Sequence, residues 1–285
     1  MNKAFQKYPL LQSKIVAKEI AAILEGATKR DIVNLNAGLC LIEPNLSKPP
    51  KLLLECAKFL DGYKSYKNGL FKDSLSSDTH KFIETIEFDT NTAVFTAIND
   101  SIFSLNITMF LKLMHSHRSF WRKHKLPLYI LAPTASFQTV DKGPHSRNGK
   151  TKYQRITVLS QCIADIKSEL IVPNNAVKGL NKKYTLFSVT PKPEMQSDIN
   201  LKLFDYMLKF LFINKSRTLK HSMKYTAANA SQDFEKSTLY DFKTPDGYLR
   251  DRRVDKISPE EFLMIFKQWE GWPCVRNGLT RDFNE

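Results

Sequence analysis

Long apolar runs are absent from this chain: no segment of its 285 residues approaches eighteen consecutive apolar side chains. A helix that crosses a bilayer needs about twenty such residues, so the sequence predicts no membrane partner. Cysteine is also scarce, and the four cysteines form no C-x-x-C pair. This spacing argues against a zinc site and against a secreted disulfide scaffold. It favours a reducing compartment, in which the cysteines are small packing residues.

Acidic residues are too few to balance the basic ones. There are 29 Asp and Glu residues against 43 Lys and Arg residues, and the formal net charge is +14. The excess is concentrated between Lys112 and Arg155, where Asp141 is the only acid. Such a concentration favours a polyanion as partner, because each neutralised phosphate releases condensed counterions. A solvated basic face without a partner is the alternative interpretation.

Hydrophobic periodicity predicts alternating strands and helices in the first two thirds of the chain. The length suits one large domain and one small domain. One strand is expected to end within 31–38, and others are expected at 51–56, 93–98 and 127–132, followed by a hairpin-like segment at 184–189. Helices are expected near 15–24, 107–122 and 151–163. Strands that alternate with helices indicate an α/β fold with a doubly wound parallel sheet.

The pattern becomes helical after Pro191 and Pro193. Helices are expected at 201–212, 218–225 and 259–269. The last of these begins behind Ser258, with Glu261 at the third helical position, which is the pattern of a capping box. The sequence therefore predicts two domains: an α/β domain at 1–191 and a small all-helical domain with a tail at 192–285.

A basic segment provides the most specific motif of the chain. It reads F-I-N-K-S-R-T-L-K-H-S-M over 212–223. This resembles the signature F-x-x-[RK]-x-[RK]-[TM]-[LI]-x-[NH]-[SA]-[LM] that opens the C-terminal helical domain of the rRNA adenine dimethyltransferase family. Similar segments are G-P-H-S … Y-Q-R-I-T-V-L-S-Q at 143–161 and Y-T-L-F-S-V-T-P at 184–191. The resemblance covers nearly the whole chain and implies a Rossmann-like, S-adenosylmethionine-dependent methyltransferase fold.

The same resemblance implies a cofactor crevice that this chain has partly lost. The family's first turn carries an acid and two or three glycines, whereas this chain has Asn34 and the single Gly38. The residues that match cofactor-contacting positions are Leu10, Gly38, Glu55, Asp73 and Asn99. A structural salt bridge is an equal alternative for Glu55. We expect these positions to be vestigial and no cofactor to be required, while residual binding of S-adenosylmethionine stays open.

The base-binding turn departs further from the family pattern. Methylation of adenine N6 needs a flipped base that is held by an Asn or Asp and stacked on an aromatic ring, which the family writes as N-L-P-Y. Here residues 99–102 read N-D-S-I. Asn99 and Asp100 can accept a hydrogen bond from an amine, but the stacking ring is missing, and stacking contributes roughly 1–3 kcal/mol per base. We therefore expect methyl transfer to be lost, and we name no catalytic residue.

Basic residues in two segments are predicted to hold a nucleic-acid strand, since such binding combines cations along the phosphates with flat side chains on the bases. They are Lys142, Arg147, Lys150 and Lys152 in the first segment, and Lys215, Arg217, Lys220 and His221 in the second. Candidate stacking partners are Tyr153, Trp121 and Phe212, for each of which core packing is the simpler interpretation. The run at 250–253, R-D-R-R, is a further candidate for phosphate or for a protein partner.

Two more segments, L-A-P-T-A-S at 131–136 and a closing W-E-G-W-P at 269–273, most resemble the fungal mitochondrial transcription factors of this family. That resemblance implies an initiation factor in the mitochondrial matrix nucleoid. Such a factor binds the single-subunit mitochondrial RNA polymerase, helps to melt promoter DNA and holds the non-template strand. Two alternatives stay open: a divergent mitochondrial rRNA adenine N6,N6-dimethyltransferase, and an inactive assembly factor that binds rRNA.

Overall fold

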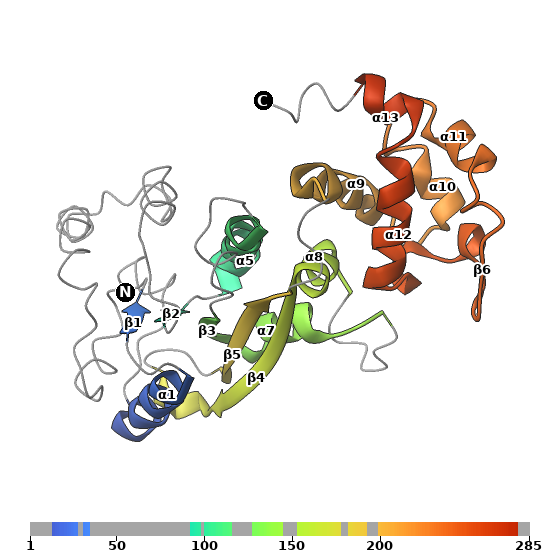
Figure 1. The fold of residues 1–285 in the computed structure, drawn as a ribbon. Helices are drawn as coiled ribbons and strands as arrows, with labels where there is room; N and C mark the ends of the chain where they lie inside the picture. The colour runs from blue at the N-terminus through green and yellow to red at the C-terminus, as the bar shows by residue number, and fades with distance from the viewer. Residues whose placement is uncertain are drawn as a thin grey trace. The chain divides into compact units, whose positions relative to one another are not determined.

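The computed structural model describes residues 13–27, 31–34, 92–97, 100–115, 127–144, 153–177, 182–192 and 199–278 (Figure 1). The chain forms two compact units. The first contains Met1–Phe137 and Ala164–Pro193, and the second contains Gln138–Ile163 and Glu194–Glu285. The segment 138–163 thus groups with the C-terminal helices. The division into domains at 191 and 192 stays a prediction.

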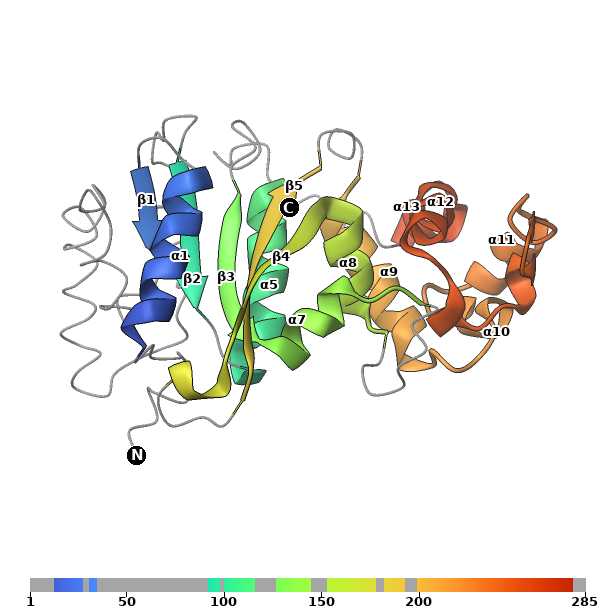
Figure 2. The ribbon, with the colours of Figure 1, turned by 90° about the horizontal axis from the view of Figure 1, so that it is seen from below.

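The first unit is built on a five-stranded sheet in the order β1-β2-β3-β5-β4. The strands are β1 (Asp31–Asn34), β2 (Thr92–Ala97), β3 (Leu128–Pro133), β4 (Ala164–Val172) and β5 (Tyr184–Pro191). Strands β1, β2 and β3 are parallel neighbours, whereas β5 is antiparallel to both β3 and β4 (Figure 2). The α/β class is confirmed. The expected parallel sheet is confirmed for β1, β2 and β3. It is wrong for β4 and β5, which are antiparallel neighbours joined by a connection too short for a helical crossover.

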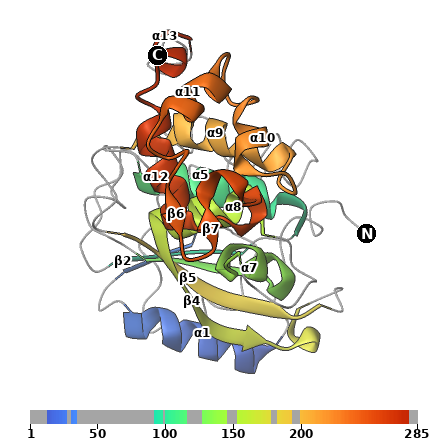
Figure 3. The same cartoon turned by 90° about the vertical axis from the view of Figure 1, so that its right-hand side faces the viewer.

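Helices α1 (Lys14–Ala27) and α5 (Asp100–His115) cover opposite faces of this sheet (Figures 1 and 3). The apolar cluster under α1 includes Val16, Ile20, Leu24, Phe95, Leu131 and Leu186. On the face of α5, the ring centroids of Phe103 and Phe187 lie 6.3 Å apart. Successive side chains of a strand point to opposite faces. In β5, Leu186 therefore packs in the core on the α1 face, and Phe187 packs in the core on the α5 face.

The second unit is mainly helical. Its helices are α8 (Arg155–Ile163), α9 (Leu201–Ile213), α10 (Leu219–Met223), α11 (Ala230–Lys236), α12 (Pro259–Trp269) and α13 (Pro273–Gly278), while α7 (Thr134–Asp141) is divided between the units. A short antiparallel pair, β6 (Lys243–Thr244) and β7 (Gly247–Tyr248), and the 3-10 turns η4 (Leu249–Asp251) and η5 (Val254–Lys256) complete it. The helices predicted at 201–212 and 259–269 are confirmed.

The beginning of α12 agrees with its sequence pattern in detail. The backbone N–H of Glu261 donates to Ser258 Oγ over 3.2 Å, and the backbone N–H of Ser258 donates to Glu261 Oε2 over 2.7 Å. These reciprocal bonds satisfy two donors that a helix end would otherwise leave without partners. The predicted capping box is therefore confirmed.

Several predictions fall on residues outside the described ranges. The strand expected at 51–56 and the final part of the helix expected at 107–122 are among them. Within the described ranges, no helix has the length and apolar character needed to cross a membrane. In the same ranges, no group of three or more His, Cys, Asp or Glu side chains is placed to hold a metal ion.

Cys274 in α13 is expected to be an unreactive thiol. Burial raises its pKa from 9.0 to about 12, and a hydrogen bond with Asp233 adds to the rise. The folded state therefore keeps the proton at a pH where the unfolded chain releases it. The stability that this difference contributes is complete below about pH 9 and is lost as the pH rises toward 12. We expect Cys274→Ala to weaken the alkaline fall in stability, measured by thermal unfolding across that range.

The same thiol provides a direct chemical check. Only the thiolate is nucleophilic, so iodoacetamide should alkylate Cys274 at least about a hundredfold more slowly at pH 8 than it alkylates free cysteine. The position of the label is read by peptide mass spectrometry. Alkylation at the rate of free cysteine would contradict the raised pKa.

Candidate nucleic-acid interface

The predicted cofactor-contacting residues Leu10, Gly38, Glu55, Asp73 and Asn99 lie outside the described residues. The structure does describe the strands that precede two of these residues in the sequence: β1 before Gly38 and β2 before Asn99. Asn34 at the end of β1 pairs with Phe95 of β2, so the carboxyl ends of two parallel strands lie side by side. In doubly wound sheets, ligands bind beside such strand ends. The structure therefore describes the edge of the expected crevice and none of the five side chains assigned to it.

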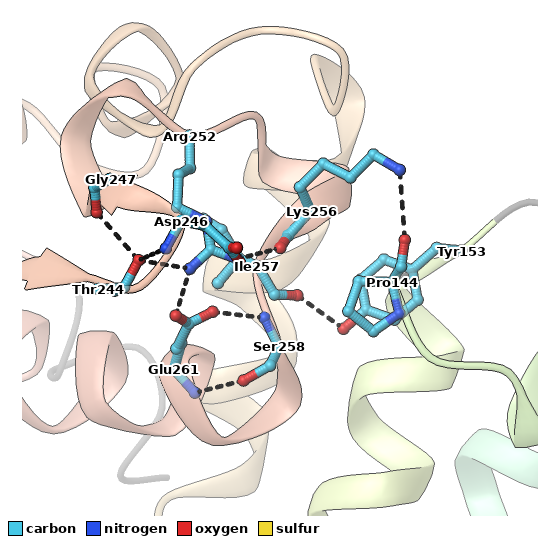
Figure 4. A network of polar contacts seen from close by, with 10 residues as sticks. All are labelled: Pro144, Tyr153, Thr244, Asp246, Gly247, Arg252, Lys256, Ile257, Ser258 and Glu261. Atoms are coloured by element: carbon cyan, nitrogen blue, oxygen red, sulfur yellow. Dashed lines mark hydrogen bonds and ion pairs between the residues drawn. The ribbon is translucent and has the colours of Figure 1, made fainter. Parts of the chain in front are cut away.

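The described residues on either side of the predicted contacts at 147–152 both bond to the C-terminal segment. On the N-terminal side, Lys256 Nζ donates to the carbonyl oxygen of Pro144 over 3.4 Å. On the C-terminal side, the Tyr153 hydroxyl donates to the carbonyl oxygen of Ile257 over 3.0 Å (Figure 4). Two neighbouring residues of the C-terminal segment thus make these two bonds. The predicted contacts Arg147, Lys150 and Lys152 belong to the residues between, and they and Trp121 lie outside the described ranges.

The ring of Tyr153 is used in packing. Its residue is 8% exposed, and its ring centroid lies 5.8 Å from that of Phe212, the other described stacking candidate. Burial raises the pKa of Tyr153, with nearby Cys162, Glu260 and Glu261 adding to the rise, so the hydroxyl stays protonated as a donor. Lys215 Nζ also donates to the carbonyl oxygen of Tyr153 over 3.0 Å. Tyr153 thus bonds within the second unit to residues of the motif and of the 252–257 segment.

The four basic residues predicted in the 212–223 motif have different surroundings. Lys215 holds Tyr153, as described above, and is partly buried. Lys220 Nζ donates to the Tyr240 hydroxyl over 2.7 Å and lies 3.3 Å from Glu235, and these two contacts, Tyr240 first, raise its pKa. The exposed Arg217 has no side-chain partner among the described residues. Arg217 is thus the cation of this motif most available to a phosphate.

His221 lies near an exposed aromatic side chain that the sequence prediction missed. Its ring centroid is 5.9 Å from that of Tyr225, and Lys224 Nζ lies 4.9 Å from the centroid of the same ring. Tyr225 is 43% exposed. An exposed ring beside cations is suited to stack on an unpaired base. The available signal was the position of Tyr225, two residues after the motif.

The two basic segments of the second unit pair along their backbones. Thr218 forms an antiparallel bridge with Arg253. The N–H of Val254 donates to the Arg217 carbonyl over 3.0 Å, and the N–H of Leu219 donates to the Arg252 carbonyl over 2.8 Å. We call residues 215–219 and 252–256 the basic ribbon. It brings Arg253 and Lys256 next to the motif, although they lie far from it in the sequence.

Comparisons with known proteins agree with this architecture. Residues 139–270 match the family model described as ribosomal RNA adenine dimethylase. The structure resembles that of a dimethyladenosine transferase from Plasmodium falciparum, with a TM-score of 0.56, 13% identity, and coverage of 92% of this chain and 98% of that chain. It also resembles the 23S rRNA methyltransferase ErmE, with a TM-score of 0.48, 14% identity, and coverage of 92% and 99%. No curated protein matches the chain.

The fold is therefore a Rossmann-like α/β fold, as in the dimethyladenosine transferase, followed by helices. This confirms the resemblance at the level of the fold, and the match to the family model covers residues 139–270. The match spans α8, the 212–223 motif and α12, the part of the chain from which the resemblance was mainly drawn. The subfamily of transcription factors stays a prediction.

Proposed function

We propose that the second unit of this chain binds a nucleic-acid strand, and that the protein acts in mitochondrial transcription initiation. The observation that argues most strongly against methyl transfer is the sequence directly after β2. Residues 99–102 read N-D-S-I in place of the N-L-P-Y pattern, and α5 begins at Asp100. A turn without the proline and the aromatic ring lacks the stack that holds a flipped adenine.

Binding of a strand is supported by the basic ribbon. Arg217 and Arg253 are exposed on it, and Lys256 contacts Pro144, which precedes the predicted contacts Arg147, Lys150 and Lys152 in the sequence. Tyr225 adds an exposed ring beside Lys224. Cations and exposed rings together are what unpaired strands require. The net charge of +14 favours association with any polyanion.

The proposed partners follow from the resemblance of 131–136 and 269–273 to the fungal mitochondrial factors. They are the single-subunit mitochondrial RNA polymerase and the melted non-template strand of promoter DNA. The proposed location is the mitochondrial matrix nucleoid. In this function S-adenosylmethionine is not required, and any binding of it would be a remnant of the fold.

A second candidate is adenine N6,N6-dimethylation of rRNA. The match of residues 139–270 to ribosomal RNA adenine dimethylases favours it, and taken alone the comparisons favour it over transcription. Its methyl donor would be S-adenosylmethionine, with Leu10, Gly38, Glu55, Asp73 and Asn99 as the residues to hold it. An rRNA-binding assembly factor without methyl transfer uses the same basic surface.

Run-off transcription by the cognate polymerase tests the proposal. The template is a duplex promoter or the same promoter melted in advance, with and without the protein. We expect the duplex to depend on the protein and the melted template to depend on it much less, because the protein's work is to open and hold the strands. No effect on either template would contradict the transcription role.

A parallel assay separates the second candidate. Transfer of labelled methyl groups from S-adenosylmethionine to small-subunit rRNA is measured for the wild-type protein and for Asn99→Ala. We expect no transfer by either protein. Transfer that Asn99→Ala abolishes would establish the methyltransferase in place of the initiation factor. Binding of rRNA without transfer, together with no effect on transcription, would leave the assembly factor.

A further inference from the structure

We propose that Arg253 is a phosphate-binding residue of the basic ribbon, and that the carboxylate of Asp255 competes with phosphate for it. The inference rests on the proposed binding of nucleic acid and adds a residue pair that sets its strength. The shared ligand chemistry is the phosphodiester backbone of an unpaired strand, either DNA or RNA. The pair lies in η5 and the residue before it, beside the 212–223 motif.

The geometry of the pair is that of an arginine bound to an oxyanion. Arg253 Nε lies 3.0 Å from Asp255 Oδ1, and Arg253 Nη2 lies 2.7 Å from Asp255 Oδ2. Two parallel N–H···O bonds of this kind are how a guanidinium also binds phosphate. The carboxylate therefore occupies the donors that a phosphate would use, and a phosphate must replace it to bind in the same way.

The pair is weak enough to be exchanged. The Arg253 side chain is 52% exposed and the Asp255 side chain is 20% exposed. Because the guanidinium is half exposed, water and salt screen the pair on that side and lower the free energy that it contributes. Asp255 itself is fixed, since its backbone N–H donates to the Lys215 carbonyl over 3.0 Å. The carboxylate is thus a fixed internal competitor beside a solvent-accessible guanidinium.

The other arginines of the 250–253 run are committed to the fold. The guanidinium carbon of Arg250 lies 4.6 Å from the Tyr240 ring centroid and 4.4 Å from that of Tyr248. Arg252 is 8% exposed and bonded to Glu261. Arg253 alone of the three projects an exposed guanidinium from the ribbon. It does so opposite Thr218, next to the exposed Arg217.

The test is the affinity of the full chain for a fluorescent single strand of deoxythymidine, and for the matching uridine strand, across a range of salt concentrations. We expect Asp255→Asn to tighten binding of both strands about two- to fivefold at low salt, since the strength of exposed ion pairs is of that order. The slope of log binding constant against log salt should steepen by about 0.7 for one more phosphate contact. Arg253→Gln should weaken binding and make the slope shallower.

The matched control is Asp241→Asn, which removes the same charge from another exposed Arg–Asp pair, that of Arg250. We expect it to change affinity much less. In an Arg253→Gln background, Asp255→Asn should have no effect, because its action passes through Arg253. Equal gains from Asp241→Asn and Asp255→Asn, an unchanged gain in the Arg253→Gln background, or a gain for only one kind of strand would each overturn the inference.

Failure of the proposed nucleic-acid binding would give a different result from failure of the proposed role of Arg253 and Asp255. If neither the wild-type protein nor any variant binds a strand, binding of nucleic acid and the role of Arg253 both fail. If the wild-type protein binds with a salt-dependent affinity and Asp255→Asn leaves it unchanged, only the role of the pair fails. Thermal unfolding of each variant confirms that the compared proteins are folded to the same extent.

Discussion

Replacing Arg252 with alanine is expected to lower the free energy of unfolding by about 3–5 kcal/mol. Arg252 is 8% exposed, and its guanidinium donates to Glu261 Oε1 and to the carbonyl oxygen of Lys256. It also lies 3.3 Å from Thr244 Oγ1 and 3.5 Å from Asp246 (Figure 4). Its removal leaves the mostly buried Glu261 carboxylate without its cation, and the cost of that burial is no longer offset.

The position of this network explains the size of the effect. Arg252 joins the β6–β7 pair, through Thr244, to the beginning of α12, through Glu261. Its own carbonyl accepts the N–H of Leu219 at the beginning of α10. One residue thus connects three local elements, each too short to be stable alone: its guanidinium contacts β6 and α12, and its backbone carbonyl contacts α10. Loss of Arg252 loosens the ribbon as well as the capping box.

Urea denaturation followed by circular dichroism measures the loss. Arg253→Ala is the matched control, because it removes the neighbouring, half-exposed arginine and should cost less than about 1 kcal/mol. Similar losses for the two variants would show that Arg252 is not the buried partner described here. Arg252→Lys should also be destabilised, since an ammonium group cannot make the same forked contacts.

A double variant isolates the contribution of the ion pair between Arg252 and Glu261 to stability. Glu261→Gln removes the carboxylate yet keeps the capping box, which accepts Gln as well as Glu at that position. Arg252→Ala combined with Glu261→Gln should therefore lose less stability than the sum of the two single variants. A strictly additive result would indicate that the ion pair contributes nothing beyond packing.

The sequence predicted local features well where one short pattern decides the structure. The capping box needs only Ser258 and Glu261 at the right spacing, and it formed as predicted. Strand β4 was not predicted, for a reason that its residues show. Its pattern, A-D-I-K-S-E-L-I-V, mixes polar and apolar positions, and the register shifts between Ser168 and Leu170. A bulge breaks the alternation on which strand prediction depends.

The candidate nucleic-acid interface shows more clearly what a local sequence pattern fails to predict. The run at 250–253 reads as three equivalent arginines, but Arg252 is buried, Arg250 lies between two tyrosine rings, and Arg253 is exposed. Tyr153 was likewise open to stacking or to packing, and the structure packs it against Phe212. These differences depend on partners that lie far away in the sequence. No local pattern distinguishes the alternatives.

Truncation of Trp269 is expected to cost about 3–5 kcal/mol of stability in Trp269→Ala. Trp269 is fully buried at the end of α12, and its ring lies 6.1 Å from that of Phe266. Its Nε1 donates to Thr226 Oγ1 over 3.0 Å, and that hydroxyl donates to the Met223 carbonyl over 2.8 Å. The indole thus fills the core and completes a buried hydrogen-bond chain to α10.

Two further variants separate these contributions. Thr226→Val keeps the volume and leaves the indole N–H without its acceptor, which should cost about 1–3 kcal/mol. Phe242→Ala is the control for loss of an aromatic ring, because Phe242 is 42% exposed and its truncation opens no buried cavity. Denaturation is followed by circular dichroism, since Trp269 would itself change a fluorescence signal. A loss for Trp269→Ala no larger than that for Phe242→Ala would contradict the packing described.

These variants also bear on function, because α10 carries the second half of the predicted motif. The chain from Trp269 through Thr226 to Met223 fixes the end of α10 that is followed by Lys224 and Tyr225. A folded Thr226→Val protein should therefore lose strand affinity if Tyr225 stacks on a base, while Phe242→Ala should not. Unchanged affinity in Thr226→Val would show that strand binding does not depend on the position of Tyr225. Arg217 and Arg253 would then be the residues that carry binding.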